Sequence, residues 1–171
     1  MTPLLHAVVL HPELWNQFTL RTSHELTPHK EVEDIWLRFQ DLKPYEDGDA
    51  SKIVDEHESM NYPAWNLLPQ ARPIIFDLMR RVEGTRLGRV LITKLAPGKK
   101  IDPHVDGGSH AEYFSRYHVV LQGGPGSLVH CGGETVQMLS GEVWYFDNSV
   151  EHSVVNNSAD SRVHLIVDIR Q

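Results

Sequence analysis

The stretch SRYHVVLQGGPGSLVHCGGETVQML, residues 115–139, contains three short runs of strand-forming residues separated by glycine-rich turns. Similar runs precede it, in GRVLITKLA (88–96), and follow it, in EVWYF (142–146), EHSVV (151–155) and SRVHLIVDI (161–169). Short strands at a spacing of about 8–12 residues are typical of barrels and sandwiches, whereas alternating β–α folds place helices between strands. This half of the chain therefore predicts a β-barrel or jelly roll.

Residues 1–87 have a more mixed pattern, and we expect their helices and strands to pack outside the barrel. Residues 12–22 (PELWNQFTLRT) predict a short helix, and residues 34–39 (DIWLRF) alternate and predict a strand. Residues 41–60 are acidic and rich in turn formers, which is typical of a surface excursion. Residues 71–84 predict a helix, because apolar side chains recur at helical spacing between a proline and a glycine: Pro73, Ile75, Leu78, Met79, Val82 and Gly84.

The length of 171 residues fits one domain, so we expect a single domain over residues 1–171, with 1–87 flanking a core at 88–171. The composition is 40% hydrophobic and 23% charged, which argues against a disordered or coiled-coil protein. A formal net charge of −7 gives no general electrostatic reason to bind nucleic acid or an anionic membrane.

The single cysteine, Cys131, excludes an internal disulfide and any cysteine-based zinc finger. The apolar run at residues 4–10 is short, is interrupted by His6 and has no preceding Lys or Arg, so it is a poor signal peptide. No window approaches the ~18 apolar residues of a membrane span. We expect a soluble, cytoplasmic protein. Its 11 histidines are many for this length and direct attention to a metal site.

Three residues of the β half have the types and spacing of a metal site. In an extended segment, His104 and Asp106 point to the same side, because residues two apart share a face. His152 follows after several predicted strands, enough for a jelly roll to return it beside the first two. Two histidines and one carboxylate form the facial triad of non-haem Fe(II) oxygenases, which leaves coordination positions open. The tripeptide alone is a weak signal, and His104 with Asp106 could instead form a surface turn, since proline and glycines flank them.

Two of the predicted strands carry polar residues on one face. Arg162, His164, Ile166 and Asp168 alternate with an apolar set, and Arg116 and His118 have the same relationship on their own strand. A guanidinium inside a barrel is costly unless a carboxylate meets it. The distal carboxylate of 2-oxoglutarate would supply such a partner for Arg162.

The stretches LITKLAPGKKIDPH, RYHVVL, GEVWYFDNSVEH and SRVHLIVDI, within residues 88–170, closely resemble the aspartyl/asparaginyl β-hydroxylase family. The resemblance implies a cupin-like, double-stranded β-helix (jelly roll) and a hydroxylase that depends on Fe(II) and 2-oxoglutarate. It further implies hydroxylation at the β-carbon of an aspartyl, asparaginyl or related amino-acid unit. The expected partners are O₂ and an amino acid, peptide or protein substrate, and the sequence does not decide among these substrates, the oligomeric state or the pathway.

The resemblance also implies roles for individual residues. His104 and His152, with Asp106, would bind the iron, and no catalytic residue is expected beyond that metal centre. The distal carboxylate of 2-oxoglutarate would pair with Arg162, and the cosubstrate would also contact His118 and Thr93. Arg116 would face the substrate. The animal member of the family has glycine at the position of Asp106, so the ordinary triad is complete in this chain. The loop between His104 and Arg116 is also longer here than in the animal enzyme.

Less specific interpretations remain open for several of these residues. Arg116 could be a surface charge at a strand edge, His118 a core histidine and Thr93 an ordinary strand residue. We expect His110 to be a loop residue, and Trp144 and Tyr145 to pack the barrel. No second metal site is expected from the spacing of the remaining histidines considered: His6, His11, His24, His29 and His57.

Two other classes of function compete with the oxygenase. One is a metal-binding cupin, such as an isomerase, a cofactor-free dioxygenase or a sensor, that does not use 2-oxoglutarate. Such a protein would have no need for a buried Arg162 ten residues after the last metal ligand. The other is a binding or structural jelly roll with an incidental metal, and the complete triad argues against it.

Overall fold

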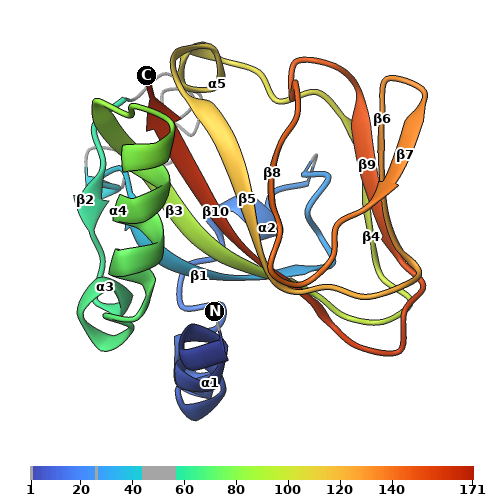
Figure 1. The fold of residues 1–171 in the computed structure, drawn as a ribbon, viewed down its shortest axis with the longest axis horizontal. Helices are drawn as coiled ribbons and strands as arrows, with labels where there is room; N and C mark the ends of the chain where they lie inside the picture. Colours follow the sequence, from blue (N-terminus) through green and yellow to red (C-terminus); the bar gives the residue numbers. More distant parts are fainter. Residues whose placement is uncertain (1, 26, 44–56) are drawn as a thin grey trace.

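The structure is a computed structural model that describes residues 2–25, 27–43 and 57–171. Within these residues the strands form two sheets that face each other (Figure 1). The larger sheet contains, in spatial order, β2 (Met60–Asn61), β1 (Val32–Phe39), β3 (Arg86–Leu95), β10 (Arg162–Arg170), β5 (Ser115–Gln122) and β8 (Val143–Tyr145). The smaller sheet contains β4 (Lys100–His104), β9 (His152–Asn156), β6 (Ser127–Cys131) and β7 (Glu134–Gln137).

The eight strands from β3 to β10 have the topology of a jelly roll. The larger sheet takes β3, β5, β8 and β10, the smaller one takes β4, β6, β7 and β9, and all the pairings are antiparallel. This is the double-stranded β-helix that the sequence predicted, the fold of cupins among others. Strands β1 and β2, from the N-terminal half, extend the larger sheet beyond β3.

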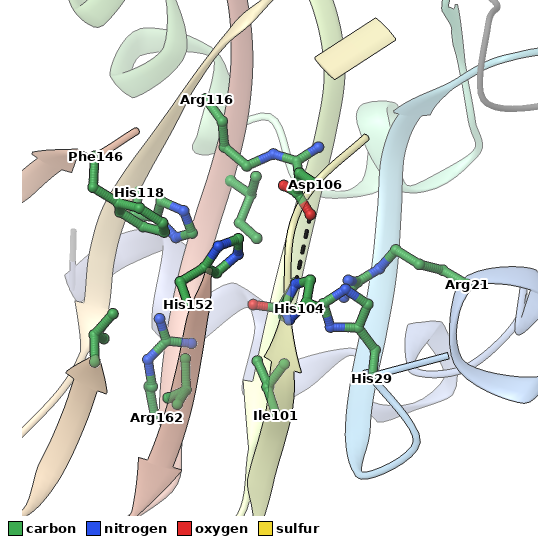
Figure 2. Close-up of a pocket in the computed structure, with 14 residues that line it drawn as sticks. Arg21, His29, Ile101, His104, Asp106, Arg116, His118, Phe146, His152 and Arg162 are labelled. Carbon is green, nitrogen blue, oxygen red and sulfur yellow. Dashed lines mark hydrogen bonds and ion pairs between the residues drawn. The ribbon is translucent and has the colours of Figure 1, made fainter. Parts of the chain in front are cut away.

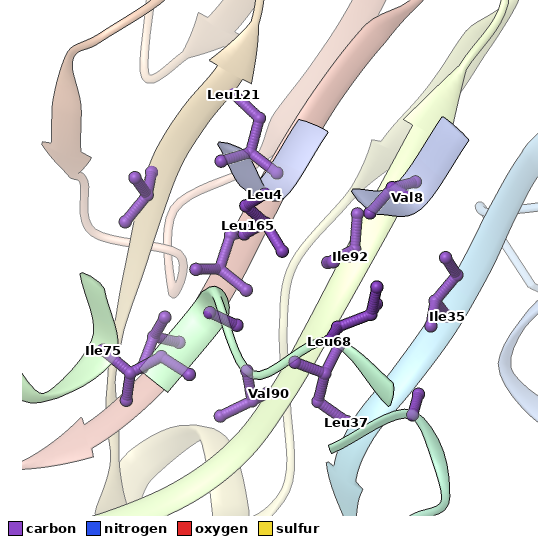
Figure 3. Packing of buried hydrophobic residues seen from close by; sticks show 14 of the residues in the cluster. Leu4, Val8, Ile35, Leu37, Leu68, Ile75, Val90, Ile92, Leu121 and Leu165 are labelled. Atoms are coloured by element: carbon purple, nitrogen blue, oxygen red, sulfur yellow. The ribbon is translucent and has the colours of Figure 1, made fainter. Parts of the chain in front are cut away.

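Helices cover the outer face of the larger sheet. The side chains of α1 (Thr2–Leu10), α3 (Ala64–Leu67) and α4 (Ala71–Arg81) join those of β1, β3, β5 and β10 in one buried apolar cluster. Figure 3 shows Leu4 of α1 close to Leu165 of β10, and Val8 of α1 close to Ile92 of β3. Burying this much apolar surface is the main force that holds the helices to the sheet. No helix of the described residues is long and apolar enough to cross a membrane.

The inner faces of the two sheets enclose a second, smaller apolar cluster, which includes Val120, Val129 and Val154. The alternation predicted for β10 is confirmed, because Val163, Leu165, Val167 and Ile169 all belong to the helix-covered cluster. Their alternating neighbours, among them Arg162 and His164, are also buried. The interior of the jelly roll is therefore partly polar, and it requires partners for its polar groups.

The N-terminal half follows the sequence predictions in part. The predicted strand at 34–39 lies within β1, and the predicted helix at 71–84 contains α4. The prediction of one continuous helix at 12–22 is wrong. This segment contains a 3-10 turn, η1 (Pro12–Leu14), and the start of a separate short helix, α2 (Leu20–Ser23). Asn16 lies between them with φ of 58°, and its backbone N–H donates to the carbonyl of Asp34. Most of the excursion predicted at 41–60 lies outside the described residues.

Several elements were not expected from the sequence, among them α1, β2 and α3. Another is β4, which pairs with β9 through an irregular register. A short helix, α5 (Ser109–Tyr113), follows Gly108, whose φ of 86° is a conformation that glycine adopts at little cost.

Candidate metal centre and the cavity behind it

His104, Asp106 and His152 lie together at one end of the jelly roll (Figure 2). His104 ends β4 and His152 begins β9, and the two residues are register partners across the sheet. One potential ligand atom from each of the three residues lies within 4.8 Å of the other two. The sequence spacing thus predicted this juxtaposition correctly, because antiparallel pairing returns β9 to β4.

The backbone fixes how the two imidazoles are turned. Nδ1 of His104 donates to the carbonyl of Asp102 at 2.8 Å, and Nδ1 of His152 donates to the carbonyl of Val150 at 2.9 Å. A proton on Nδ1 leaves Nε2 of each ring as the lone-pair donor, and such carbonyl contacts typically orient metal-ligating histidines. Burial lowers the pKa of His152, which favours the neutral form that a metal requires.

The Asp106 carboxylate is held through one oxygen. Its Oδ2 accepts from Nη1 of Arg116 at 2.6 Å and from Nδ2 of Asn148 at 2.9 Å. Its Oδ1 faces Nε2 of His104 at 3.5 Å. Burial would raise the pKa of Asp106, but the charge of Arg116 and the hydrogen bond from Asn148 hold it well below its usual range. The carboxylate is therefore ionised, with one oxygen directed at the two imidazoles.

This set of donors fits a divalent transition metal. Two imidazoles and one carboxylate, each hydrogen-bonded through an atom other than the one it would offer to the metal, match the donor set that non-haem iron enzymes use. All three residues line one cavity, so a metal held by them would be in contact with it. Metal binding at these residues stays a prediction.

Arg162 lies in the cavity behind the three residues (Figure 2). It is 4% exposed, and its Nε has no hydrogen-bond partner among the described residues. No described carboxylate forms an ion pair with it, and burial lowers its pKa to about 9. A buried guanidinium without a counterion is costly to the fold, which indicates that an anion completes this end of the cavity.

Other polar groups line or adjoin the same cavity. His118 lines it, and neither ring nitrogen has a partner among the described residues. Its ring stacks on Phe146, with centroids 5.0 Å apart, and burial together with Arg162 lowers its pKa to about 3. Thr93 also lines the cavity and is 3% exposed. The cavity thus brings together Thr93, His118 and Arg162, as the sequence predicted, without showing what they bind.

Arg116 is engaged by two carboxylates of its own chain. Besides Asp106, it contacts Asp168 with Nε at 2.8 Å and with Nη2 at 3.0 Å. Asp168 is 1% exposed and is the register partner of Arg116 across β5 and β10. The interpretation of Arg116 as a surface charge at a strand edge is wrong. Its predicted contact with substrate stays a prediction, and a substrate carboxylate would have to share this guanidinium.

His110 was expected to be a loop residue, and this expectation is wrong. It lies on α5, is 2% exposed, and its Nε2 is 3.0 Å from Oδ2 of Asp168. Tyr145 was expected to pack the barrel but is 56% exposed on the edge strand β8, whereas Trp144 packs against the inner cluster. Neighbouring residues of a strand face opposite sides, so only one of the pair can point inward.

Two further residues of the site, Arg21 and His29, were not expected from the sequence. Both come from the N-terminal half and both line the cavity. The ring of His29 lies edge-on to that of His104, with centroids 4.9 Å apart. Arg21 donates from Nε and Nη2 to the two oxygens of Asp34, at 2.9 and 2.8 Å. No pattern in a single sequence indicates that a segment so far along the chain from the β core lies beside the candidate ligands.

Comparison with solved structures finds cupin-like relatives of low identity. A predicted oxalate decarboxylase from Thermotoga maritima is 21% identical over 56% of this chain and 73% of its own, with a TM-score of 0.41. A cupin domain from Bordetella pertussis is 21% identical over 51% of this chain and 85% of its own, with a TM-score of 0.40. A search of curated proteins finds no match.

Comparison with family models gives a match over almost the whole chain. The model described as aspartyl/asparaginyl beta-hydroxylase matches residues 7–171. It therefore spans the N-terminal segment that supplies Arg21 and His29 as well as the jelly roll with His104, Asp106 and His152. Together with the resemblance of the β half, this match shows that the chain belongs to the aspartyl/asparaginyl beta-hydroxylase family.

Proposed function

We propose that the protein is a hydroxylase that requires Fe(II) and 2-oxoglutarate and acts on the β-carbon of an aspartyl, asparaginyl or related amino-acid unit. The observation that carries this proposal is the buried guanidinium of Arg162, which has no counterion among the described residues. It lines the same cavity as the three candidate ligands. A small dianion could pair one carboxylate with Arg162 and chelate the metal with its opposite end, and would thus complement both ends of that cavity.

In this proposal His104, Asp106 and His152 hold the iron through Nε2, Oδ1 and Nε2. Bound there, Fe(II) with 2-oxoglutarate and O₂ would supply the oxidising chemistry that converts a substrate C–H into C–OH, with succinate and CO₂ as coproducts. The carbonyls of Asp102 and Val150 hold the two rings in place, so the ligands need little reorganisation when the ion arrives.

The chain orients the cosubstrate through Arg162, His118 and Thr93. The two-pronged guanidinium of Arg162 matches a carboxylate, and its burial strengthens that contact. His118 stays neutral because its pKa is about 3, so it can donate one hydrogen bond without adding a charge. Apolar residues of the wall, Ile101, Val129, Val154 and Ile166, exclude water from the cavity.

The test is release of succinate from 2-oxoglutarate by protein loaded anaerobically with Fe(II) and then exposed to O₂. The assay is run with and without aspartyl and asparaginyl peptides and the free amino acids, and products are identified by mass. Succinate formation together with a substrate mass gain of one oxygen supports the proposal. A chain that binds the metal but neither binds nor consumes 2-oxoglutarate would instead be a metal-binding cupin of another activity.

A further inference from the structure

Two hollows meet at the candidate metal centre. The inner cavity holds the residues assigned above to the cosubstrate, and an outer cleft lies between the N-terminal segment and the start of α5. Five residues line both hollows: Arg21, His29, His104, Asp106 and Arg116. A substrate that occupies the outer cleft would therefore meet the metal ligands at this junction, with Arg21 and His29 on one side.

Arg21 is built into the wall of this junction. Its Nε and Nη2 are held by Asp34, which is 1% exposed, and no described residue contacts its Nη1. The segment that carries Arg21 is tied to β1 by two hydrogen bonds between Asn16 and the backbone of Asp34. The hydroxyl of Thr27 also donates to the Arg21 carbonyl at 2.6 Å. A guanidinium fixed in this way loses little conformational entropy when it binds a ligand.

His29 is fixed beside it. Its backbone N–H donates to the Thr27 hydroxyl at 3.1 Å, and its carbonyl accepts from the N–H of Val32 at 3.0 Å. The neighbouring carbonyl of Pro28 accepts from the N–H of Asp102 in β4. The imidazole lies against His104, and Figure 2 shows it between that ring and the Arg21 side chain. Its buried Nδ1 has no hydrogen-bond partner among the described residues.

The two arginines at the junction differ in how many of their nitrogens already bind carboxylates. Arg116 uses Nε, Nη1 and Nη2 on Asp106 and Asp168, so a ligand would have to compete with two carboxylates. Arg21 faces one carboxylate and keeps one nitrogen without a protein partner, on a side chain that is 18% exposed. Of the two arginines that line both hollows, Arg21 is thus the one with a donor left for an anionic group.

We propose that Arg21, oriented by Asp34 and flanked by His29, binds the side-chain carboxylate of the substrate, so that the site selects an acidic unit over its neutral amide. This inference rests on the proposed function, because it assumes that the outer cleft receives the substrate. It assigns selectivity to the N-terminal half of the chain, while the metal and cosubstrate residues come from the jelly roll.

The experiment compares binding of two matched probes, N-acetyl-aspartate methylamide and N-acetyl-asparagine methylamide. Both are titrated by calorimetry into the full chain loaded with Zn(II), with and without 2-oxoglutarate. The wild-type chain is expected to bind the aspartate probe about tenfold or more tightly than the asparagine probe. Since Arg21→Gln alone would leave Asp34 buried and unpaired, the main variant is Arg21→Gln with Asp34→Asn, which is expected to bring the ratio close to one.

Two further variants sharpen the result. Asp34→Asn alone keeps the charge of Arg21 but removes the carboxylate that orients it. This variant is expected to lower the ratio of the two probe affinities only partly. Arg80→Gln removes an exposed arginine from α4, far along the chain from the cleft, and is expected to leave the ratio unchanged. Thermal unfolding of each variant establishes that it is folded before binding is compared.

Equal affinity of the wild-type chain for the two probes, no binding of either, or a ratio that survives in the double variant would overturn the inference. Failure of the proposed function has a different signature, namely absence of 2-oxoglutarate binding to the wild-type, Zn(II)-loaded chain. The double variant is expected to keep its affinity for 2-oxoglutarate within about twofold of wild type, because Arg162 and His118 are unchanged.

Discussion

Nη1 of Arg116 donates to Oδ2 of Asp106 at 2.6 Å, so the carboxylate proposed as a metal ligand is already one member of a partly buried ion pair. The other edge of the same guanidinium is occupied by Asp168, which in turn contacts His110 on α5. This chain of contacts links β5, β10 and α5 to the candidate ligand. It fixes the orientation of Asp106 from behind, as carboxylates around metal sites commonly require.

Arg116→Lys is therefore expected to weaken metal binding by about tenfold, because an ammonium cannot reach both Asp106 and Asp168 in a forked geometry. The measurement is the dissociation constant for Co(II), followed through its visible absorption, which also reports the ligand geometry. Arg170→Lys, on the exposed end of β10, is the matched control. If Arg116 instead served only the substrate, metal affinity would stay at the wild-type value while substrate hydroxylation fell and uncoupled 2-oxoglutarate turnover continued.

His152→Ala is expected to abolish stoichiometric binding of Fe(II) while the chain stays folded. The variant removes one of three donors, and the two that remain cannot fill one face of the ion. Metal content after anaerobic loading and desalting measures the effect. His130→Ala, which changes a histidine on the adjacent strand β6, is expected to retain a full complement of iron. Undiminished affinity in His152→Ala would remove this residue from the metal site.

Arg162→Lys is expected to weaken binding of 2-oxoglutarate by roughly 1–3 kcal/mol, because the charge remains but the forked pair of donors is lost. A calorimetric titration into Zn(II)-loaded protein measures this change without turnover. Unchanged affinity would show that the distal carboxylate lies elsewhere. Metal affinity serves as the internal control, since Arg162 contacts none of the three candidate ligands in the described structure.

Arg162→Met is expected to raise the stability of the ligand-free protein while abolishing its stabilisation by 2-oxoglutarate. The buried cation has no counterion among the described residues, and an apolar side chain of similar length avoids that cost, by about 1 kcal/mol or more. For a chain of this size, this corresponds to a rise of ~2–4 °C in the unfolding midpoint. A lower midpoint in Arg162→Met would mean that the guanidinium stabilises the fold itself.

The sequence predicted the jelly roll and the proximity of His104, Asp106 and His152, because both depend on local patterns. Alternation identified the two faces of β10, and the separation of His104 from His152 covers the strands needed for β9 to pair with β4. The packing in Figure 3 follows from the same alternation, since every second residue of β10 meets the helices.

The contacts that the sequence did not predict are those that depend on register or on distant segments. Arg116 meets Asp168 only because β5 and β10 pair with those two residues opposite each other. His29 reaches His104 only because the Pro28 carbonyl bonds to β4, and Arg21 is placed by a break in the predicted helix. Composition and periodicity contain no information on such pairings, so the ion pair of Arg116 with Asp168 and the burial of His110 were not expected.

His118 makes stability depend on pH in a way that one substitution can isolate. Burial, reinforced by Arg162 and Arg116, lowers its pKa to about 3 in the folded chain, whereas an unfolded histidine titrates near 6.5. Between these two values the unfolded chain binds a proton that the folded chain does not, so the free energy of unfolding falls as the pH falls from about 6.5 toward 3. Above that window His118 is neutral in both states and contributes no pH dependence.

His118→Gln is expected to reduce the slope of stability against pH between about 6.5 and 4, because glutamine cannot take up the proton. Urea unfolding of metal-free protein at several pH values measures the slope for wild type and variant. His130→Gln is the control, since this histidine lies on β6 and outside the cavity, and its slope is expected to match wild type. An unaltered slope in His118→Gln would mean that His118 accepts a proton in the folded chain, and the cavity would then hold a second cation beside Arg162 rather than a neutral hydrogen-bond donor.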